Sequence, residues 1–202
     1  FEPSFGIKSP VWAGYFALGI SIPGKMEEIL SQPFQIQALS PTLTLSVKPE
    51  IDDGAWYSVK PKVEITSKAK REIYYYWDQD KKNLYKGPFE AEEGIHMLSY
   101  VGKVIDGGYE AVLSKVFKVD LTPPEFFQVP TAFNAEKVEL VYRVKDVSPC
   151  ESGIGKDAAE ALGDNTFKIG LVLKPGPNDF VFWAVDSCQR ISELRRTIIL
   201  DA

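Results

Sequence analysis

The chain has 202 residues, of which 45% are hydrophobic, and a formal net charge of -5 at pH 7. This length allows one large domain or two small ones, and the hydrophobic share is ample for a packed core. The acidic balance argues against a nucleic-acid partner, because phosphate binding needs concentrated Lys and Arg.

The longest apolar stretch, VWAGYFALGI at residues 11–20, is about half the roughly 20 residues that a membrane-spanning helix needs. No membrane-spanning segment is therefore predicted. The sequence begins with Phe1 rather than Met, and no basic region precedes an apolar core. We expect either that a signal segment has been removed or that the sequence is a fragment.

Residues 1–40 are predicted to form a short β-rich segment. Alternating side chains predict strands within residues 11–22 and 34–39, and KMEEILS at residues 25–31 predicts two helical turns. Three interpretations stay open: an incomplete third module, a strand pair added to the next sheet, or the remnant of a preceding domain. The strand at residues 11–20 is also a candidate for self-association by edge pairing with another chain.

After this segment the pattern becomes regular. Short stretches that alternate apolar and polar side chains are separated by turn signals about every ten residues, which is typical of a β-sandwich. Residues 43–47 and 62–67 alternate in this way, and residues 72–77 are predicted to form a strand rich in aromatic side chains. Successive side chains of a strand point to opposite faces, so Val63 and Ile65 are predicted to face inward.

Residues 95–101 and 112–119 are predicted as two further strands with one buried face each. Leu98 and Tyr100 share the inner face of the first strand. In the second strand the more apolar register places three side chains inward: Leu113, Phe117 and Val119.

Glycines and prolines divide the chain around these strands. Asp106-Gly107-Gly108 supplies the positive-φ residues of a tight reversal. Pro123 and Pro124 cannot donate to a ladder, so the sheet is predicted to end there. The predicted domains are residues 1–40, 41–122 and 123–202.

In the last domain residues 138–144 and 179–185 alternate as strands, and residues 157–162 (DAAEAL) predict one helical turn. The stretch Gly153-Ile154-Gly155-Lys156 lacks the spacing and following hydroxyl of a phosphate-binding loop and is predicted to be a turn. The two cysteines, Cys150 and Cys188, are too few for a zinc site, so a disulfide or two free thiols remain.

No catalytic residue is predicted. His96, the only histidine, lies at the start of a predicted strand, and the sequence has no GxSxG-type turn. No metal or other cofactor is predicted either. Asp78 and Asp80 offer oxygen ligands for calcium, but the spacing of an EF-hand loop is missing, so calcium at this pair is kept only as the alternative.

The aromatic run at residues 74–77 is the candidate ligand-binding site. Alternation places Tyr75 and Trp77 on one face and Tyr74 and Tyr76 on the other, so one pair must lie on the outer face. Exposed aromatic rings stack on sugars or anchor a protein partner. The alternative is that residues 1–40 cover the outer pair.

Residues 41–122 resemble the small bacterial immunoglobulin-like domain that occurs in tandem on secreted and cell-surface proteins. Residues 126–202 resemble a sister module. The segments that carry the first resemblance are Trp56-Tyr57, VEITS, IYYYWDQDKKNLYKGPF, EEGIHMLSYVGKVID and FKVDLTPP, and those that carry the second are Asp146, Asn165-Thr166-Phe167, LKPGPN and Ala184-Val185-Asp186.

In such a sandwich the loops that follow the strands ending at Asp146 and Asp186 lie side by side. We therefore predict a disulfide between Cys150 and Cys188, which would stabilise the fold by roughly 3 to 4 kcal/mol in the loop-entropy model. A bond of this kind implies an oxidising compartment.

The sequence thus predicts an all-β chain with two tandem immunoglobulin-like β-sandwiches after a short β-rich N-terminal segment. The resemblance implies a non-catalytic bacterial module that is secreted, periplasmic or on the cell surface. Its expected role is a structural spacer or an adhesion and assembly unit, with a protein or polysaccharide partner. The alternative is a carbohydrate-binding accessory module of a secreted enzyme.

Overall fold

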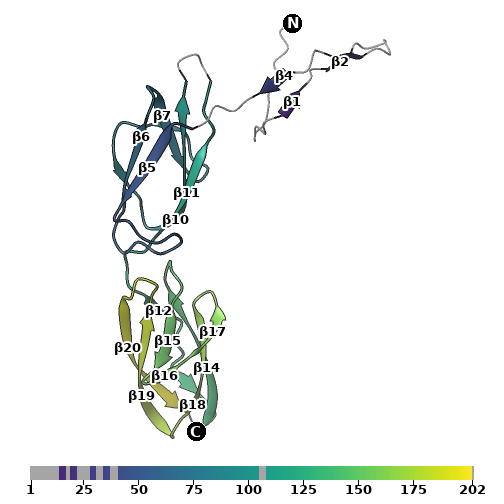
Figure 1. Ribbon diagram of the computed structural model, residues 1–202. Helices are drawn as coiled ribbons and strands as arrows, with labels where there is room; N and C mark the ends of the chain where they lie inside the picture. The colour runs from purple at the N-terminus through teal and green to yellow at the C-terminus, as the bar shows by residue number, and fades with distance from the viewer. Residues whose placement is uncertain are drawn as a thin grey trace. The chain divides into compact units, whose positions relative to one another are not determined.

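The computed structural model describes residues 14–16, 19–21, 28–30, 34–36, 41–104 and 108–201, and in these ranges the chain consists of β-strands, turns and extended segments (Figure 1). The predicted all-β class is confirmed. None of the described segments forms a helix long and apolar enough to cross a membrane.

The N-terminal segment contains two short antiparallel ladders. β1 (Gly14–Phe16) pairs with β4 (Phe34–Ile36), and β2 (Gly19–Ser21) pairs with β3 (Glu28–Leu30). The helical turns predicted around β3 are wrong for its three residues, because pairing with β2 satisfies their backbone groups and two isolated helical turns are not stable alone. The other residues of the predicted strand at 11–20 lie outside the described ranges.

Two sheets form before the double proline. Their strands are β5 (Leu43–Lys48), β6 (Lys62–Ser67) and β9 (Phe89–Glu90) in one sheet, and β7 (Glu72–Trp77), β8 (Asn83–Leu84), β10 (Gly94–Lys103) and β11 (Leu113–Val119) in the other. The sheet orders are β5-β6-β9 and β11-β10-β7-β8. A parallel bridge joins Tyr57 to Val119 beside these ladders.

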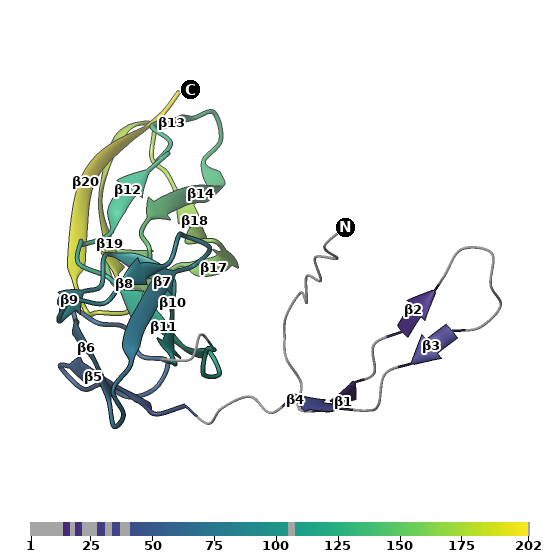
Figure 2. The ribbon, with the colours of Figure 1, turned by 90° about the horizontal axis from the view of Figure 1, so that it is seen from above.

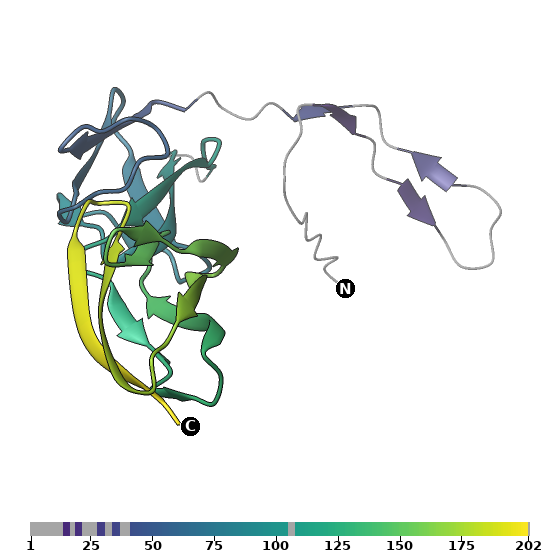
Figure 3. The same cartoon turned by 90° about the horizontal axis from the view of Figure 1, so that it is seen from below.

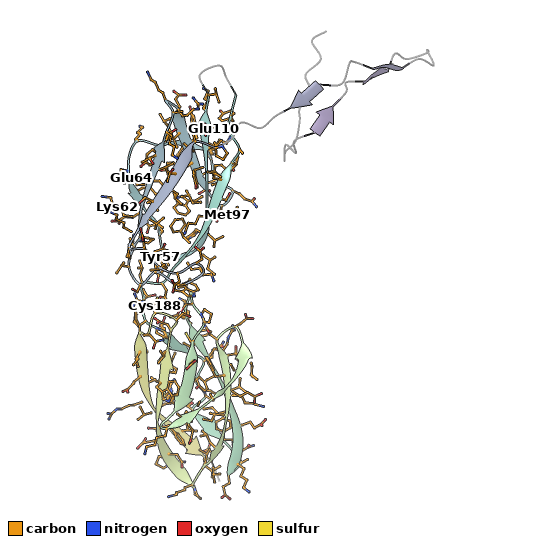
Figure 4. The ribbon with its side chains drawn as sticks, viewed as in Figure 1. Tyr57, Lys62, Glu64, Met97, Glu110 and Cys188 are labelled. Carbon is orange, nitrogen blue, oxygen red and sulfur yellow. The ribbon has the colours of Figure 1, made fainter. Side chains whose placement is uncertain are left out.

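The inner faces follow the predicted alternation. Val63 and Ile65 on β6 are buried, and the side chains of Lys62 and Glu64 between and beside them are exposed (Figure 4). The predicted inner face of the next two strands is buried as well, with Leu113 half-buried: Leu98, Tyr100, Phe117 and Val119.

Two further sheets form after the double proline. The first has the order β12-β14-β18-β17 and the second β13-β20-β19-β15-β16. Their strands are β12 (Glu125–Phe127), β13 (Ala132–Phe133), β14 (Lys137–Lys145), β15 (Glu151–Ile154), β16 (Asp157–Ala158), β17 (Glu160–Gly163), β18 (Thr166–Val172), β19 (Gly176–Val185) and β20 (Ile191–Leu200).

This order is that of an immunoglobulin-like sandwich. Lettered along the chain, the first sheet is A-B-E-D and the second holds C, F and G, as in the immunoglobulin fold. The short β13 runs parallel to β20, whereas β12 and β14, β14 and β18, β15 and β19, and β19 and β20 pair antiparallel. Figures 2 and 3 show the two layers from opposite ends, with yellow β20 in one of them.

The core of the second sandwich is built around Tyr142, whose side chain is almost fully buried. Its ring centroid lies 5.2 Å from that of Phe182 and 5.8 Å from that of Phe167. The Tyr142 hydroxyl is hydrogen-bonded to Ser152 Oγ at 2.9 Å, and Ser152 Oγ donates to the carbonyl of Trp183. The two sheets therefore meet at Tyr142, whose ring packs against other aromatic rings and whose hydroxyl has a hydrogen-bond partner.

The helical turn predicted for residues 157–162 is wrong, because these residues belong to β16 and β17. A hairpin directs the chain into β16: Gly155 has φ +59°, and a Cβ at Gly153 would lie 2.2 Å from the carbonyl oxygen of Asp157. Of the turn predicted at Gly153-Ile154-Gly155-Lys156, Gly155 and Lys156 form the turn, whereas Gly153 and Ile154 belong to β15.

Backbone contacts divide the chain into two compact units. One consists of Phe1–Leu45, Ile65–Gly87 and Ser99–Ser114, and the other of Ser46–Glu64, Pro88–Leu98 and Lys115–Ala202. The boundaries predicted at residues 40/41 and 122/123 stay predictions.

A buried carboxylate anchors the start of β5 in the first of these units. Glu110 is buried, and its side chain accepts hydrogen bonds from Thr42 N at 3.0 Å, Thr42 Oγ1 at 2.8 Å and Arg71 Nε at 3.0 Å. Burial by itself raises the pKa of Glu110, but these bonds outweigh it and hold the pKa below the ordinary value.

We expect Glu110→Gln to lower the free energy of unfolding by about 2 kcal/mol at pH 7, because charged hydrogen bonds are lost in a buried place. The folded-state pKa is lowered, so this contribution is present above the unfolded pKa and is lost as pH falls through the folded value. Urea unfolding at pH 7 and below pH 4.5 measures it. Glu64→Gln, at an exposed position, should change little; an equal loss in both variants would contradict the account.

Candidate functional site

Residues 120–124, which connect β11 to β12 and which we call the joint, are held by side chains of the same compact unit. Glu93 Oε1 accepts hydrogen bonds from Leu121 N at 2.9 Å, Thr122 N at 3.1 Å and Thr122 Oγ1 at 2.9 Å. The bond from the Leu121 backbone is the largest cause that lowers the pKa of Glu93. The joint is therefore hydrogen-bonded to Glu93, the residue directly before β10, and is not a free linker.

His96 supports this arrangement. Its Nε2 is hydrogen-bonded to the carbonyl of Glu93 at 3.1 Å, and a Cβ at Gly94 would lie 2.7 Å from the same ring nitrogen. Gly94 has φ +127°, which a side chain would strain. His96 thus packs over a turn that only glycine fits.

Arg190 contacts Asp120 of the joint and also the backbone at Ser58. Its Nη2 donates to the carbonyl of Ser58 at 2.7 Å. Its Nη1 lies 3.5 Å from Asp120 Oδ1 and 3.6 Å from Asp186 Oδ2. One guanidinium therefore faces two carboxylates that are fully or almost fully buried.

A third carboxylate completes the group. Asp120 follows β11, Asp146 follows β14 and Asp186 follows β19, and one oxygen of each lies within 4.8 Å of the others. We call these three residues the aspartate cluster. The ends of three strands thus bring together acids that are far apart in the sequence.

Short local bonds orient two of the three aspartates. Asp146 Oδ1 accepts from Ser148 N at 2.7 Å, and Asp186 Oδ1 accepts from Cys188 N at 2.7 Å and Arg190 N at 2.8 Å. Aspartate commonly bonds its own backbone two residues on when a strand ends in a turn. These bonds fix one oxygen of each side chain.

The remaining oxygens have no such bonds. In the described part of the chain, both oxygens of Asp120 and the Oδ2 atoms of Asp146 and Asp186 are buried without a hydrogen-bond partner. Burial raises the pKa of Asp146, and the charges of Asp120 and Asp186 raise it further. If all three carboxylates are ionised, the cluster carries three negative charges beside the one positive charge of Arg190.

Hydrogen bonds connect the loops that carry the cluster. Asn165 Oδ1 accepts from Cys150 N at 2.8 Å, and its Nδ2 donates to the carbonyl of Ser148 at 2.9 Å. Ser187 N donates to Ser148 Oγ at 3.1 Å. The aspartates are thus held in place by bonds outside the cluster itself.

The disulfide predicted between Cys150 and Cys188 is absent from the structure, in which both cysteines are free. The prediction that the two loops are neighbours agrees with the bond between Ser187 and Ser148, but the sulfurs have other contacts. Cys150 Sγ donates to the carbonyl of Ser148 at 3.6 Å. For Cys188, burial raises the pKa, whereas a hydrogen bond with Arg190 lowers it.

The aromatic run of β7 is half-buried along its length, from Tyr74 to Trp77. Tyr74 packs edge-on against Tyr109 and Tyr75 against Tyr85, both with ring centroids 6.4 Å apart. Both faces of the strand therefore have packing partners. Ligand binding by Tyr74, Tyr75, Tyr76 and Trp77 stays a prediction.

An open groove of about 850 Å³ lies beside the aspartate cluster. Its lining includes Trp56, Phe127, Arg143 and Asp146, and the side chain of Phe127 is 50% exposed. Asp146 thus belongs both to the groove wall and to the cluster. By contrast, Asp78 and Asp80, the predicted calcium alternative, belong to no acidic group of this kind among the described residues.

Comparison with protein-family models gives no match, and comparison with curated proteins gives none either. Solved structures with similar folds include the fibronectin(III)-like modules of Clostridium thermocellum CbhA, at 11% identity and TM-score 0.28 over 78% of this chain and 94% of that one. The D00-D0 domain of intimin matches at 14% identity and TM-score 0.40, over 79% of this chain and 100% of that one. Extracellular domains 3-5 of Drosophila OTK match at 12% identity and TM-score 0.35, over 94% of this chain and 72% of that one. The immunoglobulin-like assignment stands on the strand order of this chain.

Burial, and next the charges of the aspartate cluster, raise the pKa of Cys150 to about 12 from an ordinary value of 9.0. Only the thiolate reacts, so we expect Cys150 in a Cys188→Ser variant to react with iodoacetamide at pH 7 about 1000-fold more slowly than in urea. Mass spectrometry measures the rates. Equal rates in the two conditions would contradict the raised pKa. Wild-type cysteines that stay unlabelled in urea without reductant would show a disulfide and would contradict the free thiols.

Proposed function

We propose that the chain is a non-catalytic immunoglobulin-like module that acts as a structural spacer and assembly unit outside the cell. The observation that supports it is the double attachment of the joint: Glu93 accepts hydrogen bonds from the backbone of Leu121 and Thr122, and the Arg190 guanidinium lies 3.5 Å from the carboxylate of Asp120. A linker held by two such contacts has fewer conformations than a free one. Such a joint suits a protein that must hold its neighbours at a set spacing.

The setting follows from the resemblance to tandem bacterial modules of secreted and cell-surface proteins. We place the chain in the secreted, periplasmic or cell-surface fraction, with a protein or polysaccharide partner.

The spacer role predicts that strands β5–β11 and β12–β20 tumble together. Nitrogen-15 NMR relaxation should give one rotational correlation time for both sets of strands. Replacing both attachments in a Glu93→Ala, Arg190→Ala double variant should give two values, because the joint loses its bonds. Glu92→Ala is the matched control, since Glu92 is an exposed neighbour that pairs with Lys60. Two correlation times in the wild-type protein would contradict the proposal.

Carbohydrate binding is the second candidate function, favoured by the groove that Trp56 and Phe127 line. Aromatic side chains in an open groove offer flat apolar faces for sugar rings. If this function holds, polysaccharide pull-down should detect saturable binding that Trp56→Ala reduces at least tenfold. Loss on Tyr76→Ala with binding retained in Trp56→Ala would move the site to the aromatic run instead, and no binding to any polysaccharide would remove this candidate.

A further inference from the structure

The aspartate cluster has a charge imbalance that nothing in the described part of the chain resolves. When its three carboxylates are ionised they carry three negative charges, and Arg190 supplies one positive charge at 3.5 and 3.6 Å from two of them. Two negative charges remain in a place where Asp120 is 0% and Asp186 2% exposed. Buried charge of this kind needs a partner, because burial removes the water that stabilises it.

The unpartnered oxygens converge. Asp120 has no hydrogen bond to either carboxylate oxygen, and one of its oxygens lies within 4.8 Å of an oxygen of Asp146 and of Asp186. The backbone bonds to Asp146 Oδ1 and Asp186 Oδ1 orient those side chains and leave each Oδ2 without a hydrogen bond. Asp120 Oδ1 and Asp186 Oδ2 have Arg190 Nη1 as a charged neighbour, at 3.5 and 3.6 Å, but no hydrogen bond. Carboxylates that are oriented through one oxygen and lack a hydrogen bond at the other are arranged as metal ligands are.

The oxygen donors and their irregular arrangement favour calcium. Two oxygens bound to one calcium ion at 2.3 to 2.6 Å are at most about 5 Å apart, whereas magnesium at 2.0 to 2.1 Å limits them to about 4 Å. Calcium also accepts irregular sets of six to eight oxygens, in which water and carbonyl groups complete the shell. The oxygens of the cluster lie within 4.8 Å of one another, a span that one calcium ion can bridge. The Cys150 and Cys188 thiols nearby are poor ligands for so hard a cation.

We propose that Asp120, Asp146 and Asp186 bind one calcium ion at the joint. Two negative charges left beside Arg190 match the charge of a divalent cation, and Asp146 also lines the groove beside the cluster. The ion would connect the segment after β11 to the loops after β14 and β19. The inference deepens the proposed function, since the same joint would be fixed by the ion, but binding itself does not depend on a spacer role.

Calorimetric titration of the chelator-treated full chain with CaCl₂ tests the proposal. We expect one site with a dissociation constant of about 1 mM or lower, as in extracellular calcium modules, and at least about tenfold weaker binding of MgCl₂. Calcium should also raise the melting temperature, because it binds the folded state only. No heat and no change in melting temperature at about 10 mM CaCl₂ would overturn the proposal.

An Asp146→Asn variant separates an ion site from a purely structural role. It keeps the acceptor for Ser148 N and removes one of three facing charges, so without calcium it should melt at or above the wild-type temperature. With calcium only the wild type should gain stability, which reverses the order of the two proteins. An equal gain in the variant would overturn the assignment.

Asp80→Asn is the matched control, because Asp80 is exposed and was the alternative calcium ligand in the sequence. It should respond to calcium as the wild type does, and a lost response would place the ion elsewhere and overturn the proposal. NMR relaxation with calcium distinguishes the two proposals. If calcium binds but two correlation times are measured, the spacer role is refuted and the ion site stands. If one correlation time is measured but calcium does not bind, the ion site is refuted and the spacer role stands.

Discussion

The constraint on which the rest of the structure depends is the meeting of one guanidinium with three carboxylates, two buried and one half-buried, at the joint. Arg190 pairs with Asp120 and Asp186 and also bonds the carbonyl of Ser58. Charges in a place shielded from water interact strongly, so this group stabilises the structure only when its total charge is balanced. The proposed spacer role and the proposed calcium site both depend on how that balance is reached.

The sandwich fold supplies the geometry for this meeting. β11 delivers Asp120, β14 delivers Asp146 and β19 delivers Asp186, each at the residue after the strand ends. The aromatic core around Tyr142 packs β14 against β19. The hydrogen bonds of Asn165 to Ser148 and Cys150 hold the loop that follows β14 and Asp146. Rigid strands thus position side chains that no local segment could bring together.

Much of the fold follows from the alternation of side chains, because one buried face per strand leaves a direct trace in the sequence. This is why the inward positions of Leu98 and Phe117 were predictable. The aromatic run of β7 gave no such answer, since packing on both faces leaves every residue half-buried. Residues 157–162 have helix-forming side chains, but pairing with neighbouring strands overrides that local preference.

The aspartate cluster was not predictable from spacing, because its members come from three strands and each one alone reads as an ordinary turn residue. The one signal was their common position directly after a strand.

The most direct test of the central claim is the anomalous diffraction of crystals grown with calcium. The account predicts a single peak 2.3 to 2.6 Å from oxygens of Asp120, Asp146 and Asp186, at about the distances of protein calcium sites. Density that shows the three carboxylates bonded to one another through a proton, with calcium elsewhere or nowhere, would contradict it.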